Sequence, residues 1–234
     1  MEFNKLSAPS LKELFIKELE TMILSGRLPI GSKLPPEREL AQSMQVSRAV
    51  INTGITELAR KGFLIIRPRI GTFVADYRRD GTLETLIAIM NYNGGILRDD
   101  EIRSILELRI ALDSLAVRLC IPKITESEIR ILKEYANSIK NAATNDLASE
   151  LAFSFQHELA FLSGNTLLPL LFSSFKAPVM SLWNRYCTLY GIETLYKNTA
   201  LLCDCIELRD AQRAVDCLTS TIEETIHGTK KIYY

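Results

Sequence analysis

The chain has 234 residues, of which 47% are hydrophobic and 24% are charged, and this composition is typical of a folded globular protein. Its 28 basic residues balance its 28 acidic residues, but residues 1–80 carry 13 basic and nine acidic side chains, a net charge of +4, which leaves −4 on the remainder. Such asymmetry indicates nucleic-acid contact in the basic part, although ordinary fluctuation explains it as well.

Three further features argue against a membrane or secreted protein. The sequence has no uncharged apolar run of about 18 residues, and its start, MEFNKLSAPS, lacks the pattern of a secretory signal. Five cysteines, an odd number, fit reduced thiols better than a disulfide framework. Cys203 and Cys205 have no second pair or nearby histidine, so we expect them to pack in a core. The expected location is cytoplasmic, with no membrane contact.

The first expected helix covers residues 10–24 and begins at Ser10, a residue type that caps helix N-termini. Its apolar residues recur at helical spacing, and they are Leu11, Leu14, Phe15, Leu19, Met22 and Ile23. This helix is expected to complete the core of the segment that follows.

Residues 31–76 predict two short helices and a β-hairpin, in the order of a winged helix-turn-helix. Two prolines precede a helix over 37–43, where proline is tolerated in the first turn. Ser47 is placed to cap a second helix over 48–61, which has an apolar face and a polar outer face. Gly62 ends that helix, and FLIIR and GTFVAD give two strands joined around residues 68–71. We expect the outer face to contact DNA.

The polar segment YRRDGT, residues 77–82, predicts a linker. Beyond it only helical periods occur, and the expected helices cover residues 83–91, 99–119, 125–143, 146–163, 167–190, 193–208 and 209–227. Short connections between them predict an antiparallel bundle. The predicted fold class is mostly α, with a winged helix-turn-helix domain at 1–76 that carries a small β-hairpin wing, and an all-α helical domain at 83–234.

The stretch LPPERELAQSMQVSRAVINTGITELARKGFLIIRPRIGTFV resembles the DNA-binding domain of the GntR family of bacterial transcription regulators. In the second half, ILELRIALDSLAVRL and FQHELAFLSGNTLLPLL are similar to segments of the all-helical effector domain in the fatty-acid regulator (FadR or FCD-like) branch. The resemblance implies a homodimer that binds a palindromic operator in double-stranded DNA. It also implies a small-molecule effector bound in the helical domain, which serves for dimerisation as well.

The expected DNA contacts combine this resemblance with the residue types. Arg38 and Arg48 are implied contacts, and Arg48 is our candidate for bidentate readout of guanine. Asn52 replaces the arginine usual in the family, which predicts weaker phosphate contact or a preference shifted toward adenine. Arg69 and Ile70 stand where the family commonly has glycine and a basic residue, so the wing is expected to be atypical. The predicted contacts are Lys33, Arg38, Ser47, Arg48, Ala49, Asn52, Arg67, Arg69, Gly71 and Thr72. The alternative is that these positions are only solvated charges.

Most members of the branch are implied to bind a divalent metal through an aspartate, a histidine four residues later and two further histidines. Alignment on Ser-Gly-Asn puts Ala152 at the aspartate position and Gln156 at the first histidine position. The chain has only two histidines, His157 and His227, and His157 is expected at the surface or the core edge. We therefore predict no metal and no other cofactor. The acyl-CoA-binding regulators of the branch lack the metal set in the same way.

Arg109 is the main candidate for effector binding, because a guanidinium on an apolar helix is costly to bury without a partner. It resembles the pocket arginine of the branch, and a carboxylate or phosphate effector would pair with it. The alternatives are a structural pair with Asp113, four residues later, and an exposed position. The full predicted set is Arg109, Asp113, Gln156 and Tyr186. An acyl-CoA effector is a second candidate, although residues 219–223 match the acyl-CoA contacts of the branch poorly.

The sequence thus predicts a DNA-binding transcription regulator controlled by a carboxylate or acyl-CoA effector. No catalytic residues are predicted, because no nucleophile–base pair, metal triad or glycine-rich phosphate loop is evident. The alternatives are an enzyme, or a protein-interaction module, that carries the winged helix as an appendage. The interaction module predicts indifference to salt and to Arg48→Ala.

Overall fold

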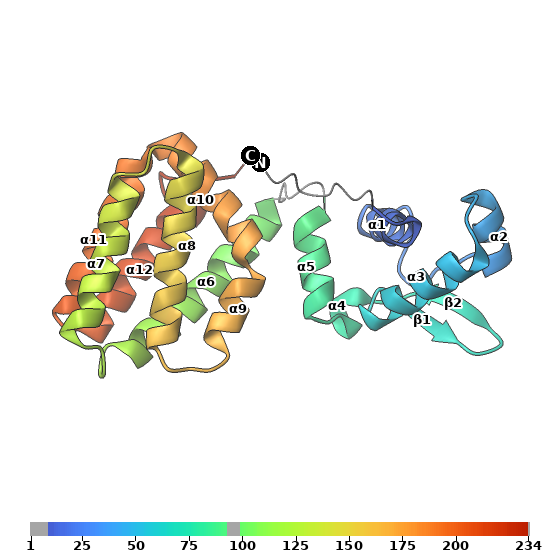
Figure 1. Cartoon of the computed structure of the whole chain (residues 1–234), viewed down its shortest axis with the longest axis horizontal. Helices are drawn as coiled ribbons and strands as arrows, with labels where there is room; N and C mark the ends of the chain where they lie inside the picture. Colours follow the sequence, from blue (N-terminus) through green and yellow to red (C-terminus); the bar gives the residue numbers. More distant parts are fainter. Residues whose placement is uncertain (1–8, 93–98, 234) are drawn as a thin grey trace, which may run out of the picture. The chain divides into compact units, whose positions relative to one another are not determined.

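The computed structural model describes residues 9–92 and 99–233, and the chain divides into two compact units, Met1–Gly94 and Gly95–Tyr234. The first unit holds the helices α1 (Leu11–Leu24), α2 (Glu37–Ser43), α3 (Arg48–Arg60), α4 (Tyr77–Asp80) and α5 (Leu83–Asn91) and the strands β1 (Leu64–Arg67) and β2 (Gly71–Val74) (Figure 1). The mostly helical fold with a winged helix-turn-helix is confirmed.

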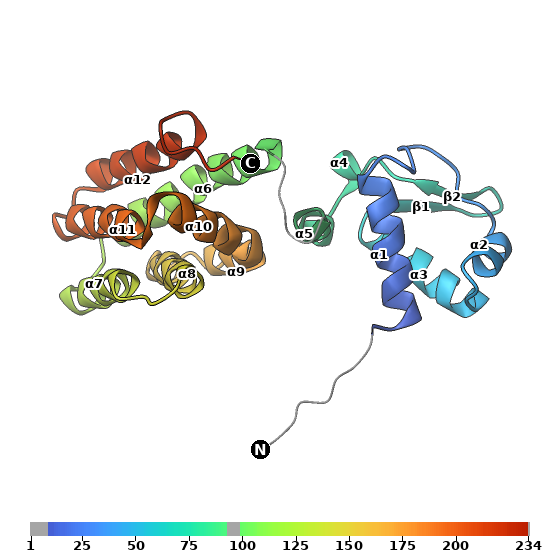
Figure 2. The same cartoon turned by 90° about the horizontal axis from the view of Figure 1, so that it is seen from above.

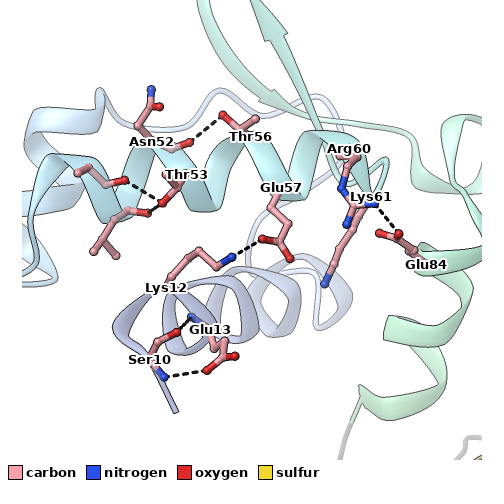
Figure 3. Close-up of polar contacts among 12 residues, drawn as sticks. Ser10, Lys12, Glu13, Asn52, Thr53, Thr56, Glu57, Arg60, Lys61 and Glu84 are labelled. Atoms are coloured by element: carbon pink, nitrogen blue, oxygen red, sulfur yellow. Dashed lines mark hydrogen bonds and ion pairs between the residues drawn. The ribbon is translucent and has the colours of Figure 1, made fainter.

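Local capping sets where the first helices begin. The Ser10 hydroxyl accepts a hydrogen bond from the Glu13 backbone N–H at 3.2 Å, and the Glu13 carboxylate accepts from the Ser10 N–H at 2.8 Å (Figure 3). This reciprocal capping box pairs two N–H groups that the helix itself leaves free. Ser47 caps α3 as predicted, since its hydroxyl accepts from the Val50 N–H at 3.3 Å.

The core of the first unit forms where α1 crosses α3 behind the hairpin. Phe15, Leu19, Ile51, Leu58 and Phe63 are at most 4% exposed, so the apolar face of α3 points inward as predicted. Leu11 and Leu14 share the helical spacing of α1 but are 56% and 49% exposed, and therefore lie outside this core.

The strands β1 and β2 pair antiparallel, with Leu64 opposite Val74 and Arg67 opposite Gly71. Arg69 has a φ of 65° in the connecting turn, a left-handed conformation that non-glycine residues seldom adopt. Lys33 extends the hairpin by an isolated antiparallel bridge to Phe73. The base of the wing is thereby tied to the loop that precedes α2.

The unit boundary lies later than the predicted linker at 77–82. Residues 77–80 form α4, and α5, expected to open the helical domain, belongs to the first unit. The Thr85 hydroxyl donates to the backbone carbonyl of Lys61. Arg60 pairs with Glu84 at 2.5 Å, as Figure 3 shows. These contacts hold α5 against the C-terminal end of α3, which the polar composition of the segment did not reveal.

The second unit contains α6 (Asp99–Cys120), α7 (Glu126–Lys140), α8 (Asn145–Leu162), α9 (Leu168–Ser174), α10 (Lys176–Tyr190), α11 (Ile192–Glu207) and α12 (Ala211–Ile226). Figure 2 shows α7 beside α8 and α11, and α12 beside α6. The single helix predicted over 167–190 is wrong, because it breaks at Phe175 into α9 and α10. Pro178 explains the break, since its nitrogen cannot donate to the carbonyl of Ser174.

Within the described ranges, none of the helices combines the length and the apolar character needed to cross a bilayer.

Candidate nucleic-acid interface and helical-domain cavity

The N-terminal part of α3 presents an exposed polar face. Ser47, Arg48, Ala49 and Asn52 are all exposed, while Ile51 and Ile55 on the opposite side are buried. In residues 9–92, Arg48 and Arg38 take part in no ion pair, so their guanidinium groups remain available to an external anion. Ser47 and Arg48 stand at the N-terminal, positive end of the α3 dipole, which itself favours phosphate.

Two cations flank Phe73 at the base of the wing. The Cζ atom of Arg67 lies 4.9 Å and the Nζ atom of Lys33 lies 5.9 Å from the ring centroid of Phe73. Such cation–π contacts restrain both side chains while their charges stay in solvent. Arg67 and Lys33 therefore form one basic patch with a fixed apolar base.

The remaining wing residues of the predicted set differ in accessibility. Arg69 is exposed at the turn, and Ile70 beside it is 58% exposed. Gly71 and Thr72 are only half-buried, and the Thr72 carbonyl accepts from the Leu34 N–H at 2.8 Å. A Cβ atom on Gly71, whose φ is 135°, would lie 2.5 Å from Cε of Lys33. The Lys33 side chain can move aside, but the φ of Gly71 is one that residues with a side chain rarely adopt, and this is a structural reason for glycine besides DNA contact.

The second unit contains a partly open cavity of about 110 Å³ between α6, α8, α10, α11 and α12. Arg109 and Asp113 line it from α6, Gln156 from α8 and Tyr186 from α10, so all four residues predicted for effector binding lie around one space. The rest of the lining is mainly apolar and includes Leu106, Phe155, Leu182, Leu195 and Ile222. A few polar groups in an apolar concavity are typical of small-molecule sites.

Arg109 is held by a buried acid and an aromatic ring. Its Nη2 atom lies 3.3 Å from Oδ2 of Asp113, and its Cζ atom lies 4.6 Å from the ring centroid of Trp183. The ion pair left open as an alternative is therefore present, and the Arg109 side chain is only 15% exposed. Burial raises the pKa of Asp113, even though Arg109 and the Gln156 amide, which donates to it, act in the opposite direction.

Part of this polar cluster lacks hydrogen-bond partners. Across residues 9–92 and 99–233, the Nε of Arg109 and the Oε1 of Gln156 are buried without one. Leaving a buried donor or acceptor unpaired costs about 1–3 kcal/mol. The cluster therefore retains hydrogen-bonding capacity that the fold itself does not use.

Several residues of the cavity were not found from the sequence. Asn198 donates to the Tyr186 hydroxyl at 3.0 Å, and the ring of Trp183 makes a cation–π contact with the guanidinium of Arg109. Ile232, only 2% exposed, also lines the cavity, because the C-terminal segment crosses α10. Arg185 donates to the Ile232 carbonyl at 2.6 Å and fixes this crossing. No local pattern marks these positions, since they meet only in the tertiary structure.

The residues at the positions of the branch's metal ligands do not fit a metal ion. Ala152 has no donor atom, and the Gln156 amide is already engaged with Asp113. The described part of the chain contains no group of three or more His, Cys, Asp or Glu side chains suited to a metal. Divalent metals of this kind need carboxylate or imidazole ligands, so we assign no metal ion to this site.

His157 lies half-buried at the edge of the core, between the rings of Phe153 and Phe161. Its Nε2 atom is 2.9 Å from the Ser173 hydroxyl and 3.1 Å from the Pro169 carbonyl. The sequence had not predicted this hydroxyl–imidazole pair. Among the described residues no carboxylate pairs with His157, so the third member of a catalytic triad is missing.

The fold and the exposed face of α3 define a winged-helix DNA-binding protein with a helical companion domain. The chain belongs to the GntR family of bacterial regulatory proteins and carries an FCD domain. The family model described as "Bacterial regulatory proteins, gntR family" matches residues 12–74, and the FCD domain model matches residues 104–224. It is thus a DNA-binding transcription regulator, and its family is not one of enzymes.

Relatives with known names support this assignment. The chain is 27% identical to the fatty acid metabolism regulator protein of Proteus mirabilis, over 84% of this chain and 81% of that protein. It is 26% identical to the transcriptional regulator LutR of Bacillus subtilis, over 63% of this chain and 65% of that protein. The solved structure of Lar, which controls expression of the Listeria monocytogenes agr system, has the same fold, with a TM-score of 0.62 and 15% identity over 95% of this chain and 97% of that chain.

Proposed function

We propose that the operator affinity of this regulator is controlled by a small anionic effector bound in the helical-domain cavity. The observation that carries the proposal is the position of Arg109, a largely buried cation that lines a mainly apolar cavity of about 110 Å³. A carboxylate that reaches the guanidinium would form a charge-assisted hydrogen bond, which is about twice as strong as a neutral one.

The size of the cavity favours a compact carboxylate over an acyl-CoA. Pockets for drug-sized ligands usually measure about 300–1,000 Å³, several times the volume of this cavity. The name of the Proteus mirabilis relative points to fatty-acid metabolism, and an acyl-CoA would require the cavity to open first. Ile232 and the C-terminal segment are the part whose displacement would enlarge it.

Asp113 can offset the negative charge of the effector by taking up a proton. Burial already raises the pKa of this carboxyl group. A carboxylate beside Arg109 would compete for the guanidinium and raise that pKa further, so binding is expected to be accompanied by proton uptake. Affinity for the effector should therefore increase as the pH falls toward the pKa of Asp113.

We also propose that the protein acts as a homodimer on a palindromic operator. Leu108, Leu115 and Leu119 on α6 are 39%, 40% and 38% exposed and recur at helical spacing. A second copy could cover such an apolar stripe, and two recognition helices about one turn of DNA apart would then read a palindrome. Light scattering tests this proposal, since Leu115→Glu should convert a dimer into a monomer and a monomeric wild-type protein would contradict it.

The test of the effector proposal begins with native mass spectrometry of the purified protein, followed by thermal-shift assays against short-chain carboxylates and acyl-CoAs. Binding of the ligand identified in this way should change operator affinity in the wild-type protein and in Arg103→Ala. Arg103 is an exposed arginine on the same helix and serves as the matched control. Arg109→Ala should lose the response, and Arg109→Lys should retain part of it. A full response in both Arg109 variants would contradict the proposal.

A further inference from the structure

Asn52 of α3 is tied to Glu37 of α2 across the helix-turn-helix. Its Nδ2 atom donates to Oε1 of Glu37 at 3.3 Å, although the two residues are 15 positions apart. Asn52 is exposed and Glu37 is half-buried at the first position of α2. Figure 3 shows Asn52 extending away from α1, whereas Glu57 points toward Lys12 of α1. The amide is thus held on the outer face of the recognition helix.

The neighbouring polar side chains of α3 are engaged within the helix. The Thr53 hydroxyl donates to the Ala49 carbonyl at 2.8 Å, and the Thr56 hydroxyl donates to the Asn52 carbonyl at 2.9 Å (Figure 3). The Asn52 amide, in contrast, retains one free N–H and the free Oδ1 atom after its bond to Glu37. One donor and one acceptor remain, and both belong to a single planar group.

This pair of atoms matches the major-groove edge of adenine. An asparagine recognises adenine when its amide oxygen accepts from N6 and its amide nitrogen donates to N7. Because the Glu37 carboxylate can only accept, it selects the amide orientation in which the nitrogen faces α2. Fixing a side chain before binding reduces the entropy lost on binding.

We propose that Asn52 reads an adenine in the operator and that Glu37 is the positioning residue that orients it. Arg48 and Asn52 are one helical turn apart, a rise of about 6 Å along α3. Base pairs are about 3.4 Å apart, so the adenine is expected about two base pairs from the guanine assigned to Arg48. The expected separation of the adenine from the guanine depends on the role proposed for Arg48, whereas the recognition of adenine by Asn52 does not.

Selection from a randomised duplex library with the full-length protein tests the inference. Wild-type protein should enrich one adenine in each half-site, by on the order of tenfold over other bases. Asn52→Ala should lose the preference at that position alone. Glu37→Ala should weaken it several-fold, and Glu37→Gln, whose amide oxygen also accepts, should restore it. Glu39→Ala is the matched control. Glu39 is an exposed acid of the same helix, two positions after Glu37, and its replacement should leave the adenine preference unchanged.

Two results would overturn the inference. An adenine preference that survives in Asn52→Ala would remove Asn52 from the readout. A cytosine at this position, lost in Glu37→Ala and kept in Asn52→Ala, would mean that the carboxylate accepts from cytosine N4 directly. Both results would leave the effector proposal intact, because enrichment reports DNA binding and the response to a ligand is measured separately.

Discussion

Gly54 of α3 lies directly against the ring of Phe15 of α1. A Cβ atom built on Gly54 would be 2.3 Å from Cδ1 of Phe15, a distance too short for two carbon atoms. The ring occupies the place that a side chain at position 54 would need, and α1 and α3 can approach each other because position 54 has none. The close approach of the recognition helix to its supporting helix therefore depends in part on this contact, alongside the shared core and the Lys12–Glu57 ion pair at 2.7 Å.

Replacing Gly54 by alanine should destabilise the first unit. Alanine improves helix propensity by about 1 kcal/mol, but overpacking a core usually costs about 1–3 kcal/mol. We expect a net loss of stability in urea unfolding monitored by circular dichroism. Thr56→Ala, an exposed position on the same helix, serves as control and should change stability little. An increase in the stability of Gly54→Ala would show that Phe15 moves aside at little cost.

Arg48→Ala should weaken operator binding by about 1–3 kcal/mol and relax the preference at one base pair. The residue is exposed at the N-terminal end of α3, where a guanidinium can reach guanine N7 and O6. Binding measured over a range of salt concentrations separates this role from phosphate contact. Arg67→Ala, in the wing, should instead weaken binding to all sequences and reduce the salt dependence. Unchanged affinity and specificity in Arg48→Ala would remove Arg48 from the readout.

The stability of the second unit should depend on pH through Asp113. Burial raises the pKa of Asp113 above its ordinary value of 3.8, so the folded state binds this proton more tightly than the unfolded state does. Stability from this group therefore increases as the pH falls from the folded pKa toward 3.8, and it is absent at higher pH. Unfolding of wild-type and Asp113→Asn protein across this pH range measures the effect.

The difference in unfolding free energy, wild type minus Asp113→Asn, should grow as the pH is lowered. Asp113→Asn is expected to be less stable in absolute terms, since it leaves the buried Arg109 without its counter-ion. A difference that is constant over the whole range would mean that the carboxyl group titrates as it does in the unfolded chain.

The native cysteines should react slowly with thiol reagents. Burial raises the pKa of Cys120, Cys187 and Cys217 to about 11 and that of Cys203 to about 12, and only the thiolate is an effective nucleophile. At pH 8 a colorimetric thiol assay should therefore detect little reaction in the folded protein and five thiols after denaturation. Rapid reaction of one thiol in the native state would point to local opening, and Cys217→Ser would test whether the least buried cysteine is responsible.

The sequence was sufficient to predict a structural feature wherever a short-range pattern of residues is itself the physical cause of that feature. Ser10 and Ser47 cap their helices because a hydroxyl that precedes an apolar period can accept from the first turn. The prediction of one helix over 167–190 was wrong, because the apolar periodicity continues through Pro178. Apolar periodicity does not show that proline lacks an N–H donor. The packing of α5 on the first unit was not evident from the sequence, because the contact of Thr85 with Lys61 joins segments 24 residues apart.

The sequence by itself determined the family of this protein, its winged helix-turn-helix and the residues of α3 that face outward, because these depend on short-range spacing and capping. Only the tertiary structure brought Arg109, Gln156 and Tyr186 around one cavity, inserted Ile232 beside them and joined Glu37 to Asn52. Such contacts depend on how helices far apart in the chain pack together, and packing is decided by side-chain shape and burial in three dimensions rather than by local periodicity.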